Sequence, residues 1–193
     1  MRHGETLGNA SRTVQRPDNP LSPRGVAQAE RLARRLAYAG IGAILASDLA
    51  RAAQTAERLA QATGLPVRHD PLLQERNFGD VRGTPYAELG FDLFALDYAP
   101  PNGETWEVFH ARVDRAWALV RRHAASVDGH LAVVTHGLVC RSLAARHLLL
   151  PDGEVVPERW ENTAVTIVDG PAEGARWPVR LLNCAAHLDD LAR

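Results

Sequence analysis

The sequence of 193 residues contains no lysine, and all 22 of its basic residues are therefore arginines. A Walker-type phosphate loop, a pyridoxal Schiff base and a Ser-Lys dyad each require the lysine amine, so these three kinds of site are excluded. The 23 acidic residues bring the net charge to -1, and the arginines are dispersed along the chain. Because the sequence has no basic stripe, we do not expect nucleic acid to be the main partner.

Cysteines and long apolar runs are also scarce. Only Cys140 and Cys184 occur, both in apolar-leaning segments where reduced, buried thiols are expected rather than a disulfide. Neither precedes a phosphate-cradling loop that ends in arginine, which argues against a cysteine-nucleophile phosphatase. No apolar run approaches the roughly 18 residues of a membrane span, and no signal segment opens the chain. We therefore expect a soluble cytoplasmic protein without a membrane partner, folded as one domain over residues 1–193.

What the sequence does contain is an alternation of helical and strand patterns. Ser22 followed by Pro23 predicts a helix start, and apolar residues then recur at helical spacing up to residue 40. Ser47 or Asp48 is expected to cap the next helix. Helices are further predicted over residues 49–63, 105–126 and 138–149, and strands over 41–46, 131–135, 164–168 and 179–182. This order predicts an α/β fold, a three-layer α/β/α sandwich around a mostly parallel central sheet.

Several side chains suit the cleavage of a phosphate ester without a metal. Such a reaction needs fixed cations for the dianion, a neutral group that attacks in line, and an acid for the leaving oxygen. Histidine suits the attack because much of it is neutral near pH 7, and arginine pairs two phosphate oxygens at once. The sequence offers Arg2-His3 at the chain start, Arg51 in the first turn of a helix, and His136-Gly137 after a strand. Strand-to-helix turns converge on the carboxyl edge of a parallel sheet, so these groups are expected to meet there.

The joint pattern of these blocks resembles the histidine phosphatase superfamily, also called phosphoglycerate-mutase-like, over nearly the whole chain. The blocks follow the family's order: Arg2-His3-Gly4-Glu5-Thr6 with Asn9, Leu21-Ser22-Pro23-Arg24-Gly25, Ser47-Asp48-Leu49-Ala50-Arg51-Ala52, Glu75 with Phe78-Gly79 and Gly83, Gly103-Glu104-Thr105, and Val133-Val134-Thr135-His136-Gly137. The resemblance implies a phosphoglycerate-mutase-like fold and metal-independent phosphoryl transfer through a phosphohistidine.

Carried over residue by residue, the resemblance also implies catalytic roles. His3 would become phosphorylated, and Arg2, Arg51 and His136 would bind the phosphoryl group. Glu75 would protonate the leaving alkoxide and then accept a proton from water. A bound dianion raises the pKa of a glutamate and arginines lower it, and the sequence leaves open which influence on Glu75 is larger.

The same resemblance implies further contacts with the substrate, from Asn9, Thr6 and the backbone at Gly137.

No pair of the 8 histidines has the helical i, i+4 spacing with carboxylate support that a metal site needs. We therefore expect no metal and no cofactor. The expected partner is a small phosphorylated substrate, and the sequence leaves a homodimer open.

Two branches of the superfamily share this machinery: phosphatases pass the phosphoryl group to water, and mutases return it to a second hydroxyl. Mutases are typically longer and carry a basic, tyrosine-rich segment after the acid, where this chain has the short run 76–83. Asn183 followed by His187-Leu188 resembles the small phosphatases of the broad-specificity or α-ribazole-phosphate type. We therefore favour a phosphomonoester hydrolase, with a mutase as the alternative. A third hypothesis is a non-catalytic phosphoester-binding protein. It is disfavoured because all five catalytic positions of the family are filled here, by Arg2, His3, Arg51, Glu75 and His136.

Residues 76–104, the lid segment, are rich in glycine, proline and acidic residues and are expected to pass over the sheet and cover the substrate. Two of its residues depart from the family. Arg82 stands where a glutamate is common, and Asn102 where a second glycine is common. Arg82 is expected either as an exposed lid residue or as a contact for a second anionic group of the substrate.

The chain also departs from the family at its start. A hydrophobic strand precedes the Arg2-His3 block in the family, whereas only Met1 does so here. The loss of a buried central strand would cost many kcal/mol against a total stability of about 5–15 kcal/mol. We therefore expect further residues before Met1 in the native protein. Without them, a free α-amino group would stand beside the phosphate site.

Overall fold

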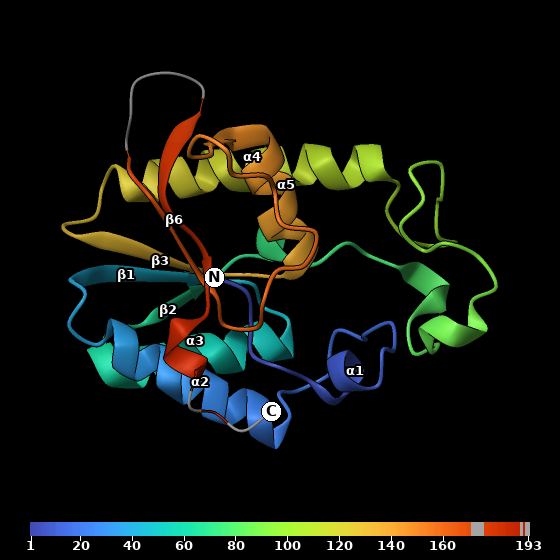
Figure 1. Cartoon of the computed structure of the whole chain (residues 1–193), viewed down its shortest axis with the longest axis horizontal. Helices are drawn as coiled ribbons and strands as arrows, with labels where there is room; N and C mark the ends of the chain where they lie inside the picture. Colours follow the sequence, from blue (N-terminus) through green and yellow to red (C-terminus); the bar gives the residue numbers. More distant parts are fainter. Residues whose placement is uncertain (171–175, 190, 192–193) are drawn as a thin grey trace.

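The computed structural model describes residues 1–170, 176–189 and 191, with helices packed on both sides of the strands (Figure 1). Its α-helices are α1 (Leu7–Ala10), α2 (Pro23–Leu36), α3 (Ala50–Thr63), α4 (Trp106–Ala124) and α5 (Gly137–His147). Figure 1 shows α2 and α3 below the strands and α4 and α5 above them. The predicted α/β class and its three layers are confirmed. None of the described helices is long and apolar enough to cross a membrane.

The strands form two three-stranded sheets. They are β1 (Ile41–Ala46), β2 (Val67–His69), β3 (His130–Val134), β4 (Leu148–Leu149), β5 (Val165–Val168) and β6 (Trp177–Cys184). One sheet has the order β2-β1-β3 and the other β4-β6-β5, and every pairing is parallel except that of β5 with β6. The prediction of a mostly parallel sheet is therefore confirmed. The carboxyl ends of β1 and β3 lie side by side, because Ala46 is in register with Val134.

Two local predictions about helix ends are wrong. The N-cap of α3 is Leu49, and neither Ser47 nor Asp48 caps this helix. The Ser47 hydroxyl instead contacts His136, and the Asp48 carboxylate accepts hydrogen bonds from Gln74. The helix predicted over 138–149 ends two residues early, because its last two residues pair with β6 as strand β4.

Residues 1–3 lie between the two sheets and are hydrogen-bonded on both sides. The Met1 α-amino group donates to the carbonyl oxygen of Val133 over 2.8 Å, and Arg2 forms an isolated parallel bridge with Thr135. On the other side, the backbone N–H of Thr163 donates to the carbonyl oxygen of Arg2 over 3.1 Å. An apolar cavity extends from Met1 between the two sheets, and Met1 does not line the separate cavity that contains His3. In this arrangement the α-amino group of Met1 lies outside the cavity that contains His3.

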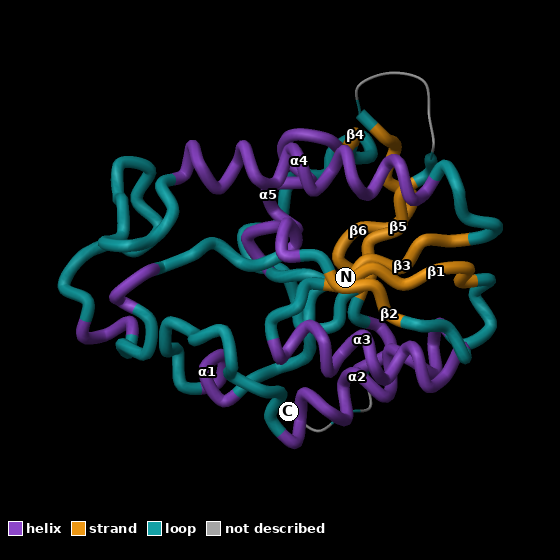
Figure 2. The backbone as a smooth tube through the Cα atoms, turned by 180° about the vertical axis from the view of Figure 1, so that it is seen from behind, coloured by secondary structure: helices purple, strands orange, loops and turns teal. Residues whose placement is uncertain are grey.

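The lid segment lies away from the strands and is built mainly of loops (Figure 2). It contains two short 3-10 helices, η2 (Gly79–Val81) and η3 (Tyr86–Glu88). Arg76 holds the two ends of the lid segment together, because it donates to the carbonyl oxygens of Glu104 and Tyr98 over 3.0 and 2.7 Å. The guanidinium of Arg76 also lies 4.0 Å from the ring centre of Trp106. The lid segment is thus a long excursion that is anchored at its base.

Candidate active site

His3 is buried, with 2% of its surface exposed, and the chain itself fixes its ring. Its Nδ1 lies 2.6 Å from the carbonyl oxygen of Gly4. Because a carbonyl oxygen only accepts, Nδ1 carries the proton and Nε2 keeps its lone pair. Burial, followed by the charges of Arg51 and Arg2, holds the pKa of His3 well below its usual value. The ring is therefore neutral with an unprotonated Nε2, which is the state that a nucleophile needs.

His136 is fully buried beside His3, and their ring centroids are 5.1 Å apart. Its Nε2 lies 2.9 Å from the hydroxyl of Ser47, whose oxygen also accepts the backbone N–H of Leu49. If Ser47 donates its proton to Nε2, the imidazole proton resides on Nδ1. Nδ1 is buried without a hydrogen-bond partner among the described residues. Burial and the charge of Arg51 hold the pKa of His136 well below its usual value. An anion next to Nδ1–H would satisfy this orphaned donor.

Arg2 and Arg51 bring two guanidinium groups to the cavity that contains His3. Arg51, in the first turn of α3, is 2% exposed and donates to the carbonyl oxygen of Arg16 over 3.0 Å. Arg2 donates to the carbonyl oxygen of Trp160. The Nε of each is buried and unpartnered within the described part of the chain. Burial lowers the pKa of both, that of Arg51 to about 10. An arginine guanidinium keeps its proton in proteins, so both are cations.

Glu75 lines the same cavity and accepts two backbone hydrogen bonds. Its Oε1 accepts the N–H of Arg76 over 3.0 Å, and its Oε2 accepts that of Leu138 over 3.2 Å. Burial raises the pKa of Glu75, and the two N–H donors and the charge of Arg51 reduce that rise without cancelling it. A carboxyl group with a raised pKa is suited to give up a proton near neutral pH.

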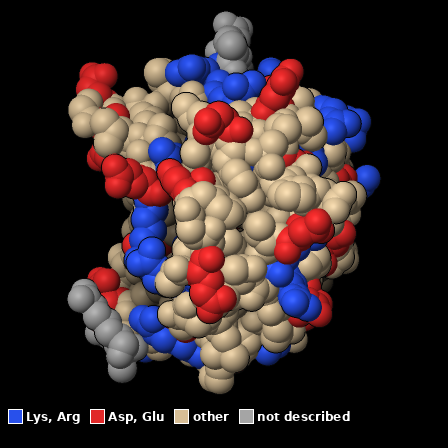
Figure 3. Space-filling view, turned by 90° about the vertical axis from the view of Figure 1, so that its right-hand side faces the viewer, with Lys and Arg blue, Asp and Glu red and all other residues tan. Residues whose placement is uncertain are grey.

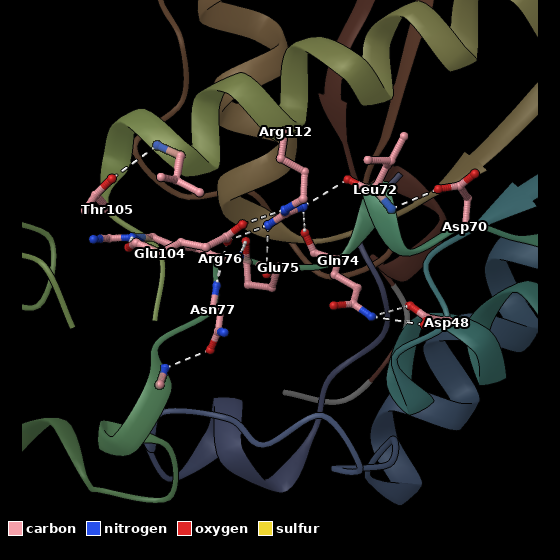
Figure 4. A network of polar contacts seen from close by, with 12 residues as sticks. Asp48, Asp70, Leu72, Gln74, Glu75, Arg76, Asn77, Glu104, Thr105 and Arg112 are labelled. Carbon is pink, nitrogen blue, oxygen red and sulfur yellow. Dashed lines mark hydrogen bonds and ion pairs between the residues drawn. The ribbon is translucent and has the colours of Figure 1, made fainter. Parts of the chain in front are cut away.

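The backbone that carries Glu75 is held by Arg112 of α4 (Figure 4). The Arg112 guanidinium donates to the carbonyl oxygens of Leu72, Gln74 and Glu75, over 2.9, 2.7 and 3.2 Å. It also forms two hydrogen bonds of 2.7 Å with the carboxylate of Glu104. Sequence reasoning missed Arg112, because a lone arginine in a helix gives no sign that it binds a distant loop.

The three residues expected to contact substrate lie in different surroundings. Asn9 and Gly137 line the cavity, and Thr6 does not. Thr6 is fully buried and caps α1: its Oγ1 accepts the N–H of Asn9 over 2.9 Å, and the Asn9 Oδ1 accepts the N–H of Thr6 over 3.2 Å. The Thr6 hydroxyl donates to Gln15 over 2.7 Å. Thr6 therefore orients Asn9 rather than facing the cavity.

The cavity extends well beyond the predicted residues, and Figure 3 shows basic atoms gathered in a recess on the lid side of the molecule. Additional lining residues are Phe78, Arg82, Tyr86 and Phe94 of the lid segment, and Arg141, Glu158, Arg159 and Trp160 outside it. The rings of Tyr86 and Phe94 meet edge to face, with centroids 6.1 Å apart. Of these residues, sequence reasoning singled out Arg82 and, as part of the block that follows Glu75, Phe78; the others belong to no motif.

Asn162 and Thr163, just before β5, hold the turn that carries His3. The Asn162 amide donates to the carbonyl oxygen of His3 over 3.0 Å, and the N–H of Thr163 donates to it over 3.3 Å. Thr163 has a φ of 57°, which is uncommon for a β-branched residue and persists only where its surroundings impose it. Its hydroxyl lies 3.0 Å from Nε2 of His187, whose pKa burial lowers to about 4. Sequence reasoning missed these hydrogen bonds from Asn162 and Thr163 to His3, because nothing in the sequence shows that Thr163 adopts a positive φ.

We expect Asn162→Ala to lower the free energy of unfolding by about 1–3 kcal/mol, because the buried carbonyl oxygen of His3 then keeps only its longer hydrogen bond. Asn19→Ala is the matched control, since it removes a surface hydrogen bond to the N–H of Arg16 and should cost at most about 1 kcal/mol. Urea titration measures both losses. Equal losses in the two variants would contradict the role given to Asn162.

The chain matches the Histidine phosphatase superfamily (branch 1) over residues 1–185. The probable phosphoglycerate mutase GpmB of Yersinia pestis (strain Pestoides F) is 32% identical over 210 residues, covering 98% of this chain and 93% of that protein. The solved alpha-ribazole phosphatase from Shigella flexneri superposes with a TM-score of 0.81 at 27% identity, covering 96% of this chain and 95% of that one. A mycobacterial glucosyl-3-phosphoglycerate phosphatase in complex with VO3 has a TM-score of 0.78 at 29% identity, covering 93% and 95%. The chain therefore belongs to the histidine phosphatase superfamily.

Proposed function

We propose that the protein hydrolyses phosphomonoesters of small metabolites through a phosphohistidine at His3. The state of the His3 ring carries the proposal: Nδ1 is committed to the carbonyl oxygen of Gly4, and Nε2 is left unprotonated in a cavity that Arg2 and Arg51 also line. A histidine in this state can attack phosphorus without first losing a proton. The similar proteins named as phosphatases for α-ribazole and glucosyl-3-phosphoglycerate support the same reaction class.

In the first step, Nε2 of His3 forms a bond to phosphorus as the bond between phosphorus and the ester oxygen breaks. Arg2, Arg51 and the Nδ1–H of His136 bind the three nonbridging oxygens, which satisfies donors that are otherwise unpartnered in the described chain. Glu75 gives its carboxyl proton to the departing alkoxide. Its raised pKa favours the protonated form that this step consumes.

In the second step, water attacks the phosphorus of phosphohistidine. The Glu75 carboxylate left by the first step takes a proton from that water, and the bond between phosphorus and Nε2 breaks. Inorganic phosphate leaves, His3 is neutral again, and Glu75 is protonated for the next turnover. The lid segment covers the substrate during both steps, since Phe78, Arg82, Tyr86 and Phe94 form one wall of the cavity.

The proposed reaction needs no metal ion, because Arg2 and Arg51 supply the positive charge that the transferred group requires. Within the described residues, no three His, Cys, Asp or Glu side chains are grouped so as to hold a metal. The proposed partner is a small phosphorylated substrate.

A phosphoglycerate mutase is the second candidate, favoured by the name of the 32% identical Yersinia relative. A mutase would use the same His3 and Glu75 but return the phosphoryl group to a second hydroxyl of its substrate. A third candidate, a non-catalytic phosphoester-binding protein, would turn over no ester. Product analysis distinguishes the three.

We expect turnover of p-nitrophenyl phosphate that a chelator leaves unchanged and that His3→Ala lowers at least about 1,000-fold, because the nucleophile is removed. His69→Ala, at an exposed histidine of β2, is the matched control and should retain activity. Loss of activity with chelator, or activity in His3→Ala, would contradict the mechanism. With 3-phosphoglycerate and its bisphosphorylated primer, formation of 2-phosphoglycerate faster than release of phosphate would replace the hydrolase by a mutase.

The raised pKa of Glu75 predicts a pH dependence that differs between leaving groups. The carboxyl group is protonated below its folded-state pKa and loses its proton as the pH rises through that value, so kcat/KM for an alkyl phosphate should fall with rising pH. p-Nitrophenolate leaves without a proton, so its kcat/KM should lack this decline. Glu75→Gln should lower kcat/KM about 100-fold or more for the alkyl ester, and far less for the aryl ester. Equal losses for both esters would argue against Glu75 as the acid.

A further inference from the structure

The cavity holds more positive charge than one phosphate group requires. Arg82 of the lid segment lines it together with Arg2 and Arg51. Among the described residues, no Asp or Glu forms an ion pair with Arg82. The acid that acts on it electrostatically, Glu104, is already bound by two 2.7 Å hydrogen bonds from Arg112. Arg82 is therefore a cation of the cavity without a matched counter-ion on the described chain.

The other arginines at the cavity differ from Arg82. Arg76 is bound to two backbone carbonyl oxygens inside the lid segment. Arg159 lies 3.6 Å from Glu161, and Arg141 is exposed on α5. Arg82 is half-buried, and burial lowers its pKa. Arg82 thus loses water around its charge without gaining an ion pair.

The turn that carries Arg82 is firmly attached to the segment that follows α1. The N–H of Gly83 donates to the carbonyl oxygen of Val14 over 2.7 Å, and the N–H of Val14 donates to Thr84 over 3.0 Å. Gly83 has a φ of 91°, a left-handed conformation that glycine adopts at no steric cost. The Arg82 side chain therefore starts from a fixed position in the cavity that Tyr86 and Phe94 also line.

A half-buried guanidinium without a counter-ion costs free energy. Arg82 and Arg51 also repel each other, and this repulsion helps to lower the pKa of Arg51. A second anionic group in the cavity would remove both costs. We propose that Arg82 is an anion subsite for the alcohol part of the substrate, so that preferred substrates are phosphomonoesters that also carry a carboxylate or another acidic group. This inference rests on the proposed function and narrows its substrate class.

A matched pair of esters tests the subsite. 3-Phosphoglycerate and glycerol 3-phosphate differ only where a terminal carboxylate replaces a hydroxymethyl group. We expect the wild-type protein to favour the acid in kcat/KM by about 10- to 100-fold, as a charge-assisted contact implies. Arg82→Gln should bring the ratio of the two kcat/KM values close to one, and Arg82→Lys should retain part of the preference. Arg115→Gln removes the same charge from an exposed site of α4 outside the cavity and should leave the ratio unchanged.

Failure of this inference is distinguishable from failure of the proposed function. If both esters are hydrolysed without preference, or if Arg82→Gln lowers both equally, the subsite is refuted and the hydrolase stands. If neither ester is hydrolysed, the proposed function fails, and calorimetry of wild type and Arg82→Gln with both esters decides the subsite. Tighter binding of the acid that Arg82→Gln abolishes would support it, and equal binding of the two esters would refute it.

Discussion

The rest of the site depends on two buried cations, Arg2 and Arg51, that form no ion pair with an acid of the described chain. Arg2 and Arg51 lie beside His3, and each keeps a buried Nε without a partner on the described chain. Their charges act with burial to keep both histidines neutral, and they limit the rise in the pKa of Glu75. An anion between them would satisfy these donors and balance the two charges at once. Under the proposed function, the site is thus organised for a phosphate group before any substrate arrives.

The fold holds the backbone of residues 1–3 and of Glu75 in place, and not only their side chains. The first three residues are hydrogen-bonded to the end of β3 on one side and to Thr163 on the other, which holds the His3 turn between the two sheets. Arg112 does the same for Glu75 by binding three carbonyl oxygens of its loop. The proposed nucleophile and the proposed acid thus come from segments with no regular structure, each held by residues distant in sequence.

The sequence predicted what depends on local patterns. The cap at Ser22, the apolar strand before His136 and the helix that carries Arg51 follow from spacing and turn chemistry. The structure places Arg51 in the cavity that contains His3, and His136 beside His3. The supporting contacts of Arg112 and Thr163 were not predictable, because they join segments far apart and leave no periodicity. The proposed cap at Ser47 failed for a related reason: its hydroxyl contacts His136, 89 residues away. Arg82 was noticed only as a departure from the family's pattern.

The covalent intermediate is the most direct test of the central claim, that His3 is the nucleophile. The protein would be mixed with p-nitrophenyl phosphate, quenched in base within one turnover because phosphohistidine is acid-labile, and its peptides analysed by mass spectrometry. The account predicts the phosphoryl group on His3, and its accumulation in Glu75→Gln because the attack of water is slowed. A phosphoryl group on another side chain, or continued turnover with His3 never modified, would contradict it.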